Sequence, residues 1–224
     1  LQAVGSPLRA ADLAATRTRH AEPLSLDYRG TTLLAPPPPT QGVTTLAIMG
    51  ILSRLDPGAL TAGGPDHLHL LVEAVKRAFL DRRGIADPDA VAQRTDEWLS
   101  ADRLDAHAAS IDAGRAMGWP HRFQTGDTVF LAACDAQGRC ASVLQSLYFD
   151  WGSGVVAGDT GILWQNRGAA FSTDTGDANR LRPGKRPFYT LNPGIGLKDG
   201  RPSLLYGCLL YTSDAADDYA VCRS

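Results

Sequence analysis

The residues with the clearest chemical potential are Gly126, Asp127 and Thr128, which precede the apolar run Val129-Phe130-Leu131-Ala132-Ala133. A threonine hydroxyl is a weak nucleophile unless a base lies beside it. If the chain is cut before Thr128, the new α-amine supplies that base within the same residue. The structural alternative is an ordinary strand residue, since β-branched side chains favour strands.

Strands must position Thr128, and the second half of the chain is rich in strand signals. The expected strands are Thr128–Cys134, 140–149, 161–165, 191–197 and 202–206. The first is predicted to be buried because it is apolar. The turns 135–138 and 198–200 each join two of these strands, so two hairpins are expected.

The first half is predicted to be mainly helical, with one early hairpin. Its expected strands are Leu24–Tyr28 and 31–34, and its expected helices are 7–15, 43–55 and 66–82. The prolines at 36–39 indicate a stiff connection inside the domain, although a PxxP ligand is an alternative. Residues 83–125 are expected to form short helices and loops. Helices before a strand-rich half favour an α+β sandwich over a βαβ repeat.

The helix 66–82 has the strongest periodicity. The apolar residues expected to share its buried face are Leu68, Leu71, Val72, Val75 and Phe79. Asp66 is a candidate cap, and Glu73 and Arg77 are spaced for an i,i+4 ion pair. His67 and His69 lie two positions apart on a helix and so point in different directions. No metal site is expected there.

Composition excludes several classes of function. A 44% hydrophobic and 21% charged chain is expected to fold, and a net charge of −2 gives no support for a nucleic-acid partner. No apolar run is long enough to span a bilayer. Cys134 and Cys140 bracket a turn and can face each other across it, but two buried free thiols are the preferred interpretation.

Six segments together resemble the γ-glutamyltransferase family of N-terminal-nucleophile hydrolases, over about residues 7–207. They are residues 22–30, 67–74, 126–128, 145–149, 165–169 and 183–188. The resemblance implies an αββα four-layer sandwich, here incomplete at both ends. It also implies a precursor that cuts itself between Asp127 and Thr128. Residues 1–127 would then belong to the large subunit and 128–207 to the small catalytic subunit.

The resemblance also implies a chemistry. Thr128 would attack the γ-amide of a glutathione-like substrate and form a γ-glutamyl ester, which water or an amino-acid or peptide acceptor then resolves. No metal or organic cofactor is implied. The two subunits of one precursor would be partners of each other. Bacterial members are often periplasmic or secreted, but the compartment of this chain is not predicted.

Individual family positions carry over one at a time. Ser146 matches a threonine that supports the nucleophile, and Tyr148 matches a substrate-facing asparagine. Arg167 matches a Gln or Glu that helps to hold the substrate's α-amino group. Tyr189 and Thr190 match a Ser-Ser pair that binds its carboxylate.

One position departs from the family in a way that alters substrate recognition. Ala170 matches an aspartate that grips the α-amino group, and alanine cannot do this, while Arg167 would repel an ammonium. A substrate acid without the α-amino group, such as a glutaryl amide, therefore becomes plausible. The non-catalytic readings are a surface arginine for Arg167, a strand hydroxyl for Ser146 and a core aromatic for Tyr189.

The tail departs from the family after Gly207. The string at 208–217 looks like a translated sequencing adapter, so residues 208–224 are expected to be non-native. The segment as written is then expected to have little transferase activity, since a family Gly-Gly turn that supplies oxyanion-hole amides is replaced. The competing hypotheses are a self-processing transferase or related glutaryl or acyl amidase, and a catalytically inactive family member with a binding role.

Overall fold

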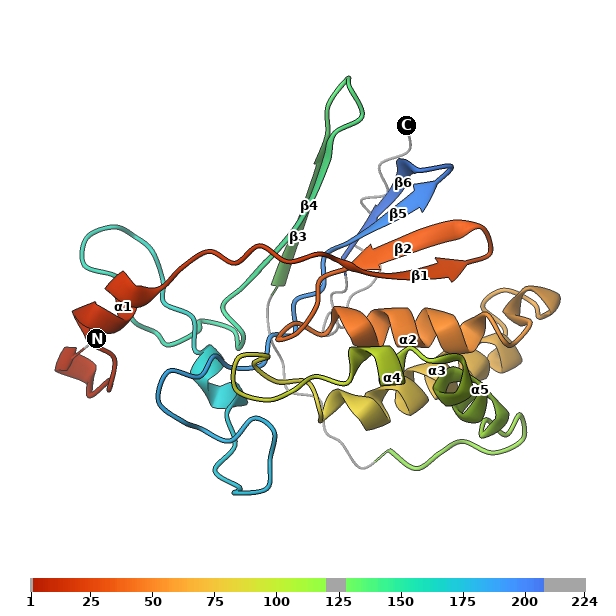
Figure 1. Cartoon of the computed structure of the whole chain (residues 1–224), viewed down its shortest axis with the longest axis horizontal. Helices are drawn as coiled ribbons and strands as arrows, with labels where there is room; N and C mark the ends of the chain where they lie inside the picture. Colours follow the sequence, from red (N-terminus) through yellow and green to blue (C-terminus); the bar gives the residue numbers. More distant parts are fainter. Residues whose placement is uncertain (1, 120–127, 208–224) are drawn as a thin grey trace.

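The computed structural model describes residues 2–119 and 128–207, and shows a mixed α+β molecule built from a sheet, a group of helices below it and a separate hairpin (Figure 1). The sheet contains β1 (Leu24–Tyr28), β2 (Thr31–Ala35), β5 (Gly194–Lys198) and β6 (Arg201–Tyr206) in that order, with every neighbouring pair antiparallel. The expected hairpins at both ends of this sheet are confirmed.

The central pairing of the sheet joins segments that lie far apart in the sequence. Strand β2 pairs with β5 through Thr32↔Leu197, Leu33↔Gly196 and Leu34↔Ile195. The sheet therefore combines strands from before and after Thr128. The isolated bridge between Thr40 and Tyr189 continues this association beyond the strands.

The helices pack against one face of the sheet and against each other. They are α2 (Gly42–Leu52), α3 (Pro65–Arg82), α4 (Thr95–Trp98) and α5 (Ala101–Ala109), with the short α1 (Ala10–Ala15) lying apart (Figure 1). Helix α2 is the centre of this layer because it is apolar on nearly all sides. Its Ile51 and Leu52 pack with Ala74 and Ala78 of α3, and its Leu46 packs with Leu33 of the sheet.

The buried face of α3 differs from the predicted one. Leu68 and Val72 are 51% and 50% exposed. The residues of α3 that are buried are Glu73, Ala74, Arg77 and Ala78. The predicted Glu73–Arg77 ion pair is present at 3.1 Å. Glu73 also accepts hydrogen bonds from Lys76 and from the backbone N–H of Met117, so the buried carboxylate is fully compensated.

Several predicted boundaries also change. Helix α3 begins at Pro65 with Gly64 as its N-cap, so Asp66 is not the cap. Strand β4 ends at Ser146 rather than at residue 149. Residues 161–165 form only an isolated bridge between Leu163 and Val156, and not a strand.

The hairpin of β3 (Thr128–Cys134) and β4 (Cys140–Ser146) stands apart from the larger sheet (Figure 1). Its contact with that sheet lies near residue 207: the Ser142 hydroxyl donates to the carbonyl of Tyr206 at 3.3 Å, and Gly207 lies against the ring of Phe130. The prediction that β3 is buried is wrong, because Val129 and Leu131 are 55% and 53% exposed. Apolar composition indicates a partner surface, but it does not identify the partner.

The cysteines of this hairpin also correct a prediction. Cys134 and Cys140 are directly opposite in the register and form a disulfide, with their Cα atoms 4.2 Å apart. Buried free thiols are thus the wrong interpretation.

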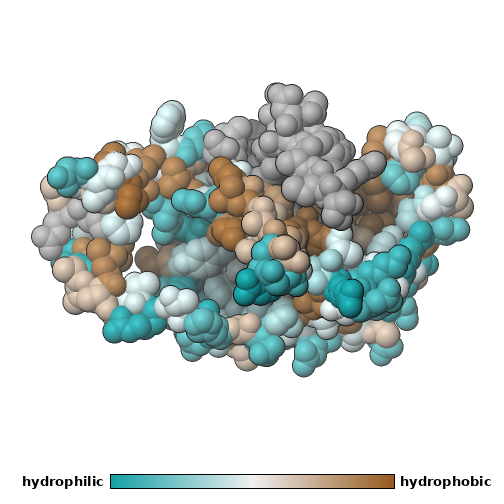
Figure 2. Space-filling model, turned by 90° about the horizontal axis from the view of Figure 1, so that it is seen from above, coloured by the Kyte–Doolittle hydropathy of each residue, from teal (hydrophilic) through white to brown (hydrophobic). Residues whose placement is uncertain are grey.

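Seen from above, exposed hydrophobic residues (brown) lie among hydrophilic ones on the side toward which the hairpin extends (Figure 2).

Candidate active site

The candidate nucleophile Thr128 is the first residue of β3, and its register partner is Ser146, the last residue of β4. The two side chains share one face of the hairpin, since directly opposed residues point the same way. Asp127, the other predicted cleavage residue, lies outside the described residues. The hairpin therefore presents two hydroxyl-bearing residues side by side at its open end.

The backbone after Ser146 turns sharply to bring Tyr148 toward Arg167. Tyr148 has φ of 83°, a left-handed conformation that is costly for a residue with a side chain. The turn is held by the N–H of Tyr148, which donates to the Ser146 hydroxyl at 2.9 Å. Asn166 completes it by donating its N–H to the carbonyl of Leu147 and accepting the N–H of Phe149.

Arg167 occupies the centre of the predicted substrate-binding residues. It opens the 3-10 helix Arg167–Ala170 and is only 1% exposed. Its guanidinium carbon lies 4.7 Å from the ring centre of Tyr148 and 5.0 Å from that of Tyr189. Its Nη1 donates to the hydroxyl of Thr190 at 3.2 Å. Three of the four predicted binding residues, Tyr148, Tyr189 and Thr190, therefore gather around the fourth, the buried cation Arg167.

The charge of this arginine is incompletely compensated. Burial lowers the pKa of Arg167, since desolvation disfavours the cation, while the nearby Tyr189 and Tyr148 act in the opposite direction. Arginine nevertheless stays protonated in proteins. Its Nη2 is buried without a hydrogen-bond partner, and no ion pair to a carboxylate of the described residues is present. A buried guanidinium of this kind favours an anionic ligand.

Tyr189 and Thr190 are held by residues from the first half of the chain. The N–H of Tyr189 donates to the carbonyl of Pro39 at 2.9 Å, and the carbonyl of Thr190 accepts from the amide of Gln41 at 2.5 Å. Contacts thus run continuously from Thr128 through Ser146, Tyr148 and Arg167 to Thr190. Ala170 adds no polar group to this set.

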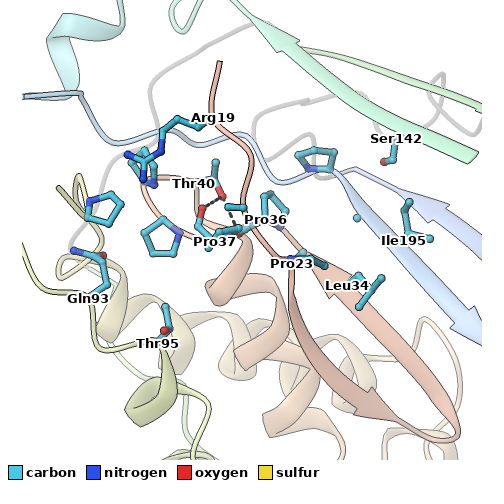
Figure 3. Close-up of a pocket in the computed structure, with 17 residues that line it drawn as sticks. Arg19, Pro23, Leu34, Pro36, Pro37, Thr40, Gln93, Thr95, Ser142 and Ile195 are labelled. Atoms are coloured by element: carbon cyan, nitrogen blue, oxygen red, sulfur yellow. Dashed lines mark hydrogen bonds between the residues drawn. The ribbon is translucent and has the colours of Figure 1, made fainter. Parts of the chain in front are cut away.

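A separate cavity of about 640 Å³ lies beside the four prolines and does not include these residues (Figure 3). It is lined by Leu34, Ile195, the prolines and Thr40, whose hydroxyl donates to the carbonyls of Pro36 and Pro37. Arg19 is the one ionisable side chain among its described lining residues. The predicted stiff connection is therefore a wall of this cavity. Neither Thr128 nor Arg167 lines this cavity.

The described residues contain no group of three or more His, Cys, Asp or Glu side chains that could hold a metal ion. His69 instead contacts the carbonyl of Asp112 at 2.9 Å. Over residues 2–119 and 128–207, no helix is long and apolar enough to cross a membrane.

Comparison with known proteins identifies the family to which the chain belongs. The family model described as gamma-glutamyltranspeptidase matches residues 1–209. The chain belongs to the γ-glutamyltranspeptidase family.

The similarity to relatives of this family extends over nearly the whole chain. The chain is 43% identical over 211 residues to the oxamate amidohydrolase proenzyme of Klebsiella pneumoniae, covering 93% of this chain and 39% of that protein. It is 42% identical to the glutathione hydrolase-like YwrD proenzyme of Bacillus subtilis, covering 92% and 39%. The chain thus spans about two fifths of the length of these relatives.

A solved structure supports the mixed α+β fold. The crystal structure of cephalosporin acylase from Bacillus halodurans matches with a TM-score of 0.78 and 32% identity, over 91% of this chain and 37% of that one. The sequence motifs therefore identify both the family and the mixed α+β architecture.

Two residues that shape this γ-glutamyltranspeptidase-family site are not singled out by sequence reasoning. Asn166 holds the turn of Tyr148, and Gln41 contacts Thr190. The available signal for Gln41 is an amide side chain placed between four prolines and an apolar helix. The signal for Asn166 is its place next to Arg167 within the segment 165–169, which carries the family resemblance.

Proposed function

We propose that this chain is part of a self-processing threonine amidohydrolase that acts on amides whose acyl group carries a carboxylate. Residues 1–127 would form the end of its large subunit, residues 128–207 the start of its catalytic subunit, and the whole an αββα sandwich. The observation that carries the proposal is Arg167, a buried guanidinium beside Thr190 with its Nη2 unpartnered.

The chemistry follows from Thr128 as an N-terminal residue. In the precursor its hydroxyl attacks the carbonyl of Asp127 and breaks the Asp127–Thr128 peptide bond, and water opens the resulting ester. The freed α-amine then takes the hydroxyl proton as Thr128 attacks the substrate amide. The proton passes to the leaving amine, the C–N bond breaks, and an acyl ester remains on Thr128. Water, or an acceptor amine, releases the acid or the transfer product.

Substrate selection depends on the charges around Arg167. A carboxylate there gains a charge-assisted hydrogen bond from the Arg167 guanidinium, which itself lies over the rings of Tyr148 and Tyr189. An α-ammonium needs an acidic partner, and position 170 is alanine. The 43% identity to an oxamate amidohydrolase, named for an amide that carries a carboxylate and no ammonium, supports this choice.

A γ-glutamyl substrate is the second candidate, and the similarity to a glutathione hydrolase-like proenzyme favours it. Glutaryl-p-nitroanilide and γ-glutamyl-p-nitroanilide differ only in the α-amino group, so the pair decides between the candidates. The intact proenzyme that contains this chain is expected to prefer the glutaryl compound. Preference for the γ-glutamyl compound would replace the first candidate by the second.

Butyryl-p-nitroanilide, which lacks the carboxylate, tests Arg167 itself. Arg167→Met is expected to raise KM for the glutaryl compound about 10- to 100-fold and to leave the butyryl compound nearly unchanged. Equal losses on both compounds would argue against a carboxylate site.

The intact mass of the wild type and of Thr128→Ala tests processing. Two fragments split before Thr128 are expected in the wild type only. A permanently single wild-type chain would favour the inactive, ligand-binding alternative.

A further inference from the structure

Gln41 is a buried amide with both ends in use. The residue precedes α2 and is 0% exposed. Its Nε2 donates to the carbonyl of Thr190 at 2.5 Å, and its Oε1 accepts from Nε of Arg82 at 3.0 Å. The orientation of the amide is chemically determined, because Arg82 can only donate and the Thr190 carbonyl can only accept.

Arg82 is itself held in place at the end of α3. Its guanidinium carbon lies 4.8 Å from the ring centre of Phe79 on the same helix and 5.1 Å from that of Phe188. Phe188 lies two residues before Thr190. Arg82 therefore contacts the segment 188–190 twice: directly at the ring of Phe188, and through Gln41 at the backbone carbonyl of Thr190. The planar, permanently charged guanidinium of Arg82 therefore fixes the orientation of the Gln41 amide.

The contacts of Gln41 reach the substrate site through Thr190. The backbone of Thr190 is held by Gln41, while its hydroxyl accepts from Nη1 of Arg167. Movement of the Thr190 backbone would move that hydroxyl and change where Arg167 points. Gln41 and Arg82 precede Thr128 in the chain, whereas Thr190 and Arg167 follow it.

We infer that Gln41, oriented by Arg82, is a positioning residue that sets the carboxylate specificity of the Arg167–Thr190 site from the other half of the molecule. The inference rests on the proposed function, in which Arg167 binds the substrate carboxylate. Gln41 touches neither substrate nor nucleophile in this scheme. It acts by fixing the Thr190 backbone, and Arg82 acts one contact further away.

The test is the ratio of KM values for butyryl- and glutaryl-p-nitroanilide in the intact proenzyme. Gln41→Met preserves length and volume but removes both hydrogen bonds. It is expected to raise KM for the glutaryl compound about five- to tenfold, with kcat less affected, and to leave the butyryl compound within about twofold. A merely structural role would change both compounds alike or lower only stability. An unchanged ratio in the folded variant overturns the inference.

Further variants keep the test decisive if Gln41→Met accumulates poorly. Gln41→Glu retains the acceptor for Arg82, replaces the donor to Thr190 by a carboxylate oxygen and adds a negative charge, so a shift of the ratio in the same direction is expected. Arg82→Gln should give a smaller shift in the same direction. The matched controls are Gln137→Met in the β3–β4 turn and Arg83→Ala beside Arg82, both at exposed positions, which should leave the ratio unchanged.

Failure of this inference is distinguishable from failure of the proposed function. If Arg167→Met abolishes the preference for the glutaryl compound while Gln41→Met and Gln41→Glu do not alter it, the carboxylate site stands and the role of Gln41 is refuted. If Arg167→Met leaves the preference intact, the proposed function itself fails and the inference with it.

Discussion

Thr128 and Ser146 are directly opposed at the open end of the β3–β4 hairpin. The Ser146 hydroxyl also accepts the N–H of Tyr148, so it links the proposed nucleophile to the turn that carries the binding residues. We expect Ser146→Ala to lower kcat on glutaryl-p-nitroanilide about 10- to 100-fold by loss of this polar support. Ser146→Thr should retain most of the activity because it keeps the hydroxyl.

Ser142→Ala is the control for this prediction. Ser142 lies on the same strand and the same face, but its hydroxyl bonds to the carbonyl of Tyr206 instead. Its kcat should stay within about twofold of wild type. Equal losses for the two alanine variants would show that the hairpin as a whole, rather than the hydroxyl of Ser146, is sensitive.

Ala170→Asp should change substrate preference. The new carboxylate would lie three residues after Arg167 on the same short helix, where it can pair with the guanidinium or with a substrate ammonium. We expect kcat/KM for the glutaryl compound to fall and that for the γ-glutamyl compound to rise, changing their ratio about tenfold or more. Ala170→Asn, which has the same shape without the charge, should change the ratio much less.

Asp81 predicts a pH-dependent contribution to stability. Burial alone would raise its pKa, but hydrogen bonds from His107 and Arg103 outweigh this and lower the pKa to about 2 from 3.8. A lowered carboxyl pKa stabilises the fold above the unfolded value, and this stabilisation is lost as pH falls through the folded value. Asp81→Asn should therefore cost about 1 kcal/mol near neutral pH, and the cost should shrink between about pH 4 and pH 2.

Urea unfolding of the uncleaved Thr128→Ala proenzyme at a series of pH values measures this cost. Asp159→Asn at an exposed position is the control and should show no such pH-dependent difference. A cost that stays constant down to pH 2 would mean that the side chain contributes by packing alone.

Gly194 leaves no room for a side chain. A Cβ there would lie 2.1 Å from the ring of its register partner Tyr206, whose hydroxyl donates to the carbonyl of Leu34 at 3.0 Å. Burial raises the pKa of Tyr206 to about 12, consistent with an enclosed phenol. Gly194→Ala should lower the free energy of unfolding by about 2–3 kcal/mol through overpacking.

Chemical denaturation checks this value, with Gly118→Ala as the control because a Cβ at Gly118 meets nothing within 4 Å. Adding Tyr206→Leu to Gly194→Ala should recover part of the loss relative to Tyr206→Leu alone. The absence of any recovery would place the strain somewhere other than in the contact between the glycine and the tyrosine ring.

The sequence predicts the elements of this fold better than their partners. The hairpins β1–β2 and β5–β6 are local and follow from their turns, whereas the pairing of β2 with β5 depends on segments about 160 residues apart. The buried face of α3 is mispredicted for a related reason. Periodicity selects Leu68 and Val72, but Glu73 and Arg77 are buried because, beside their own ion pair, each bonds to a distant residue. Glu73 accepts from the N–H of Met117, and Arg77 donates to Ser110.

The site shows the same division. Motif order suggests Tyr148, Arg167, Tyr189 and Thr190, and the structure brings these four residues together. The contact of Gln41 with Thr190 spans 149 positions and has no local signature. Local patterns therefore indicate residues that face a ligand, while the residues that hold them are found only from three-dimensional contacts.

The strand order β1-β2-β5-β6 also determines when the sheet can form during synthesis. A ribosome delivers Thr128 well before it delivers β5, the second neighbour of β2. The sheet is therefore complete only after residue 206 has emerged, and a nascent chain that stops earlier lacks part or all of β5 and β6. Once the sheet has closed, the backbone ladder between β2 and β5 joins the halves without any need for an intact peptide bond at Thr128.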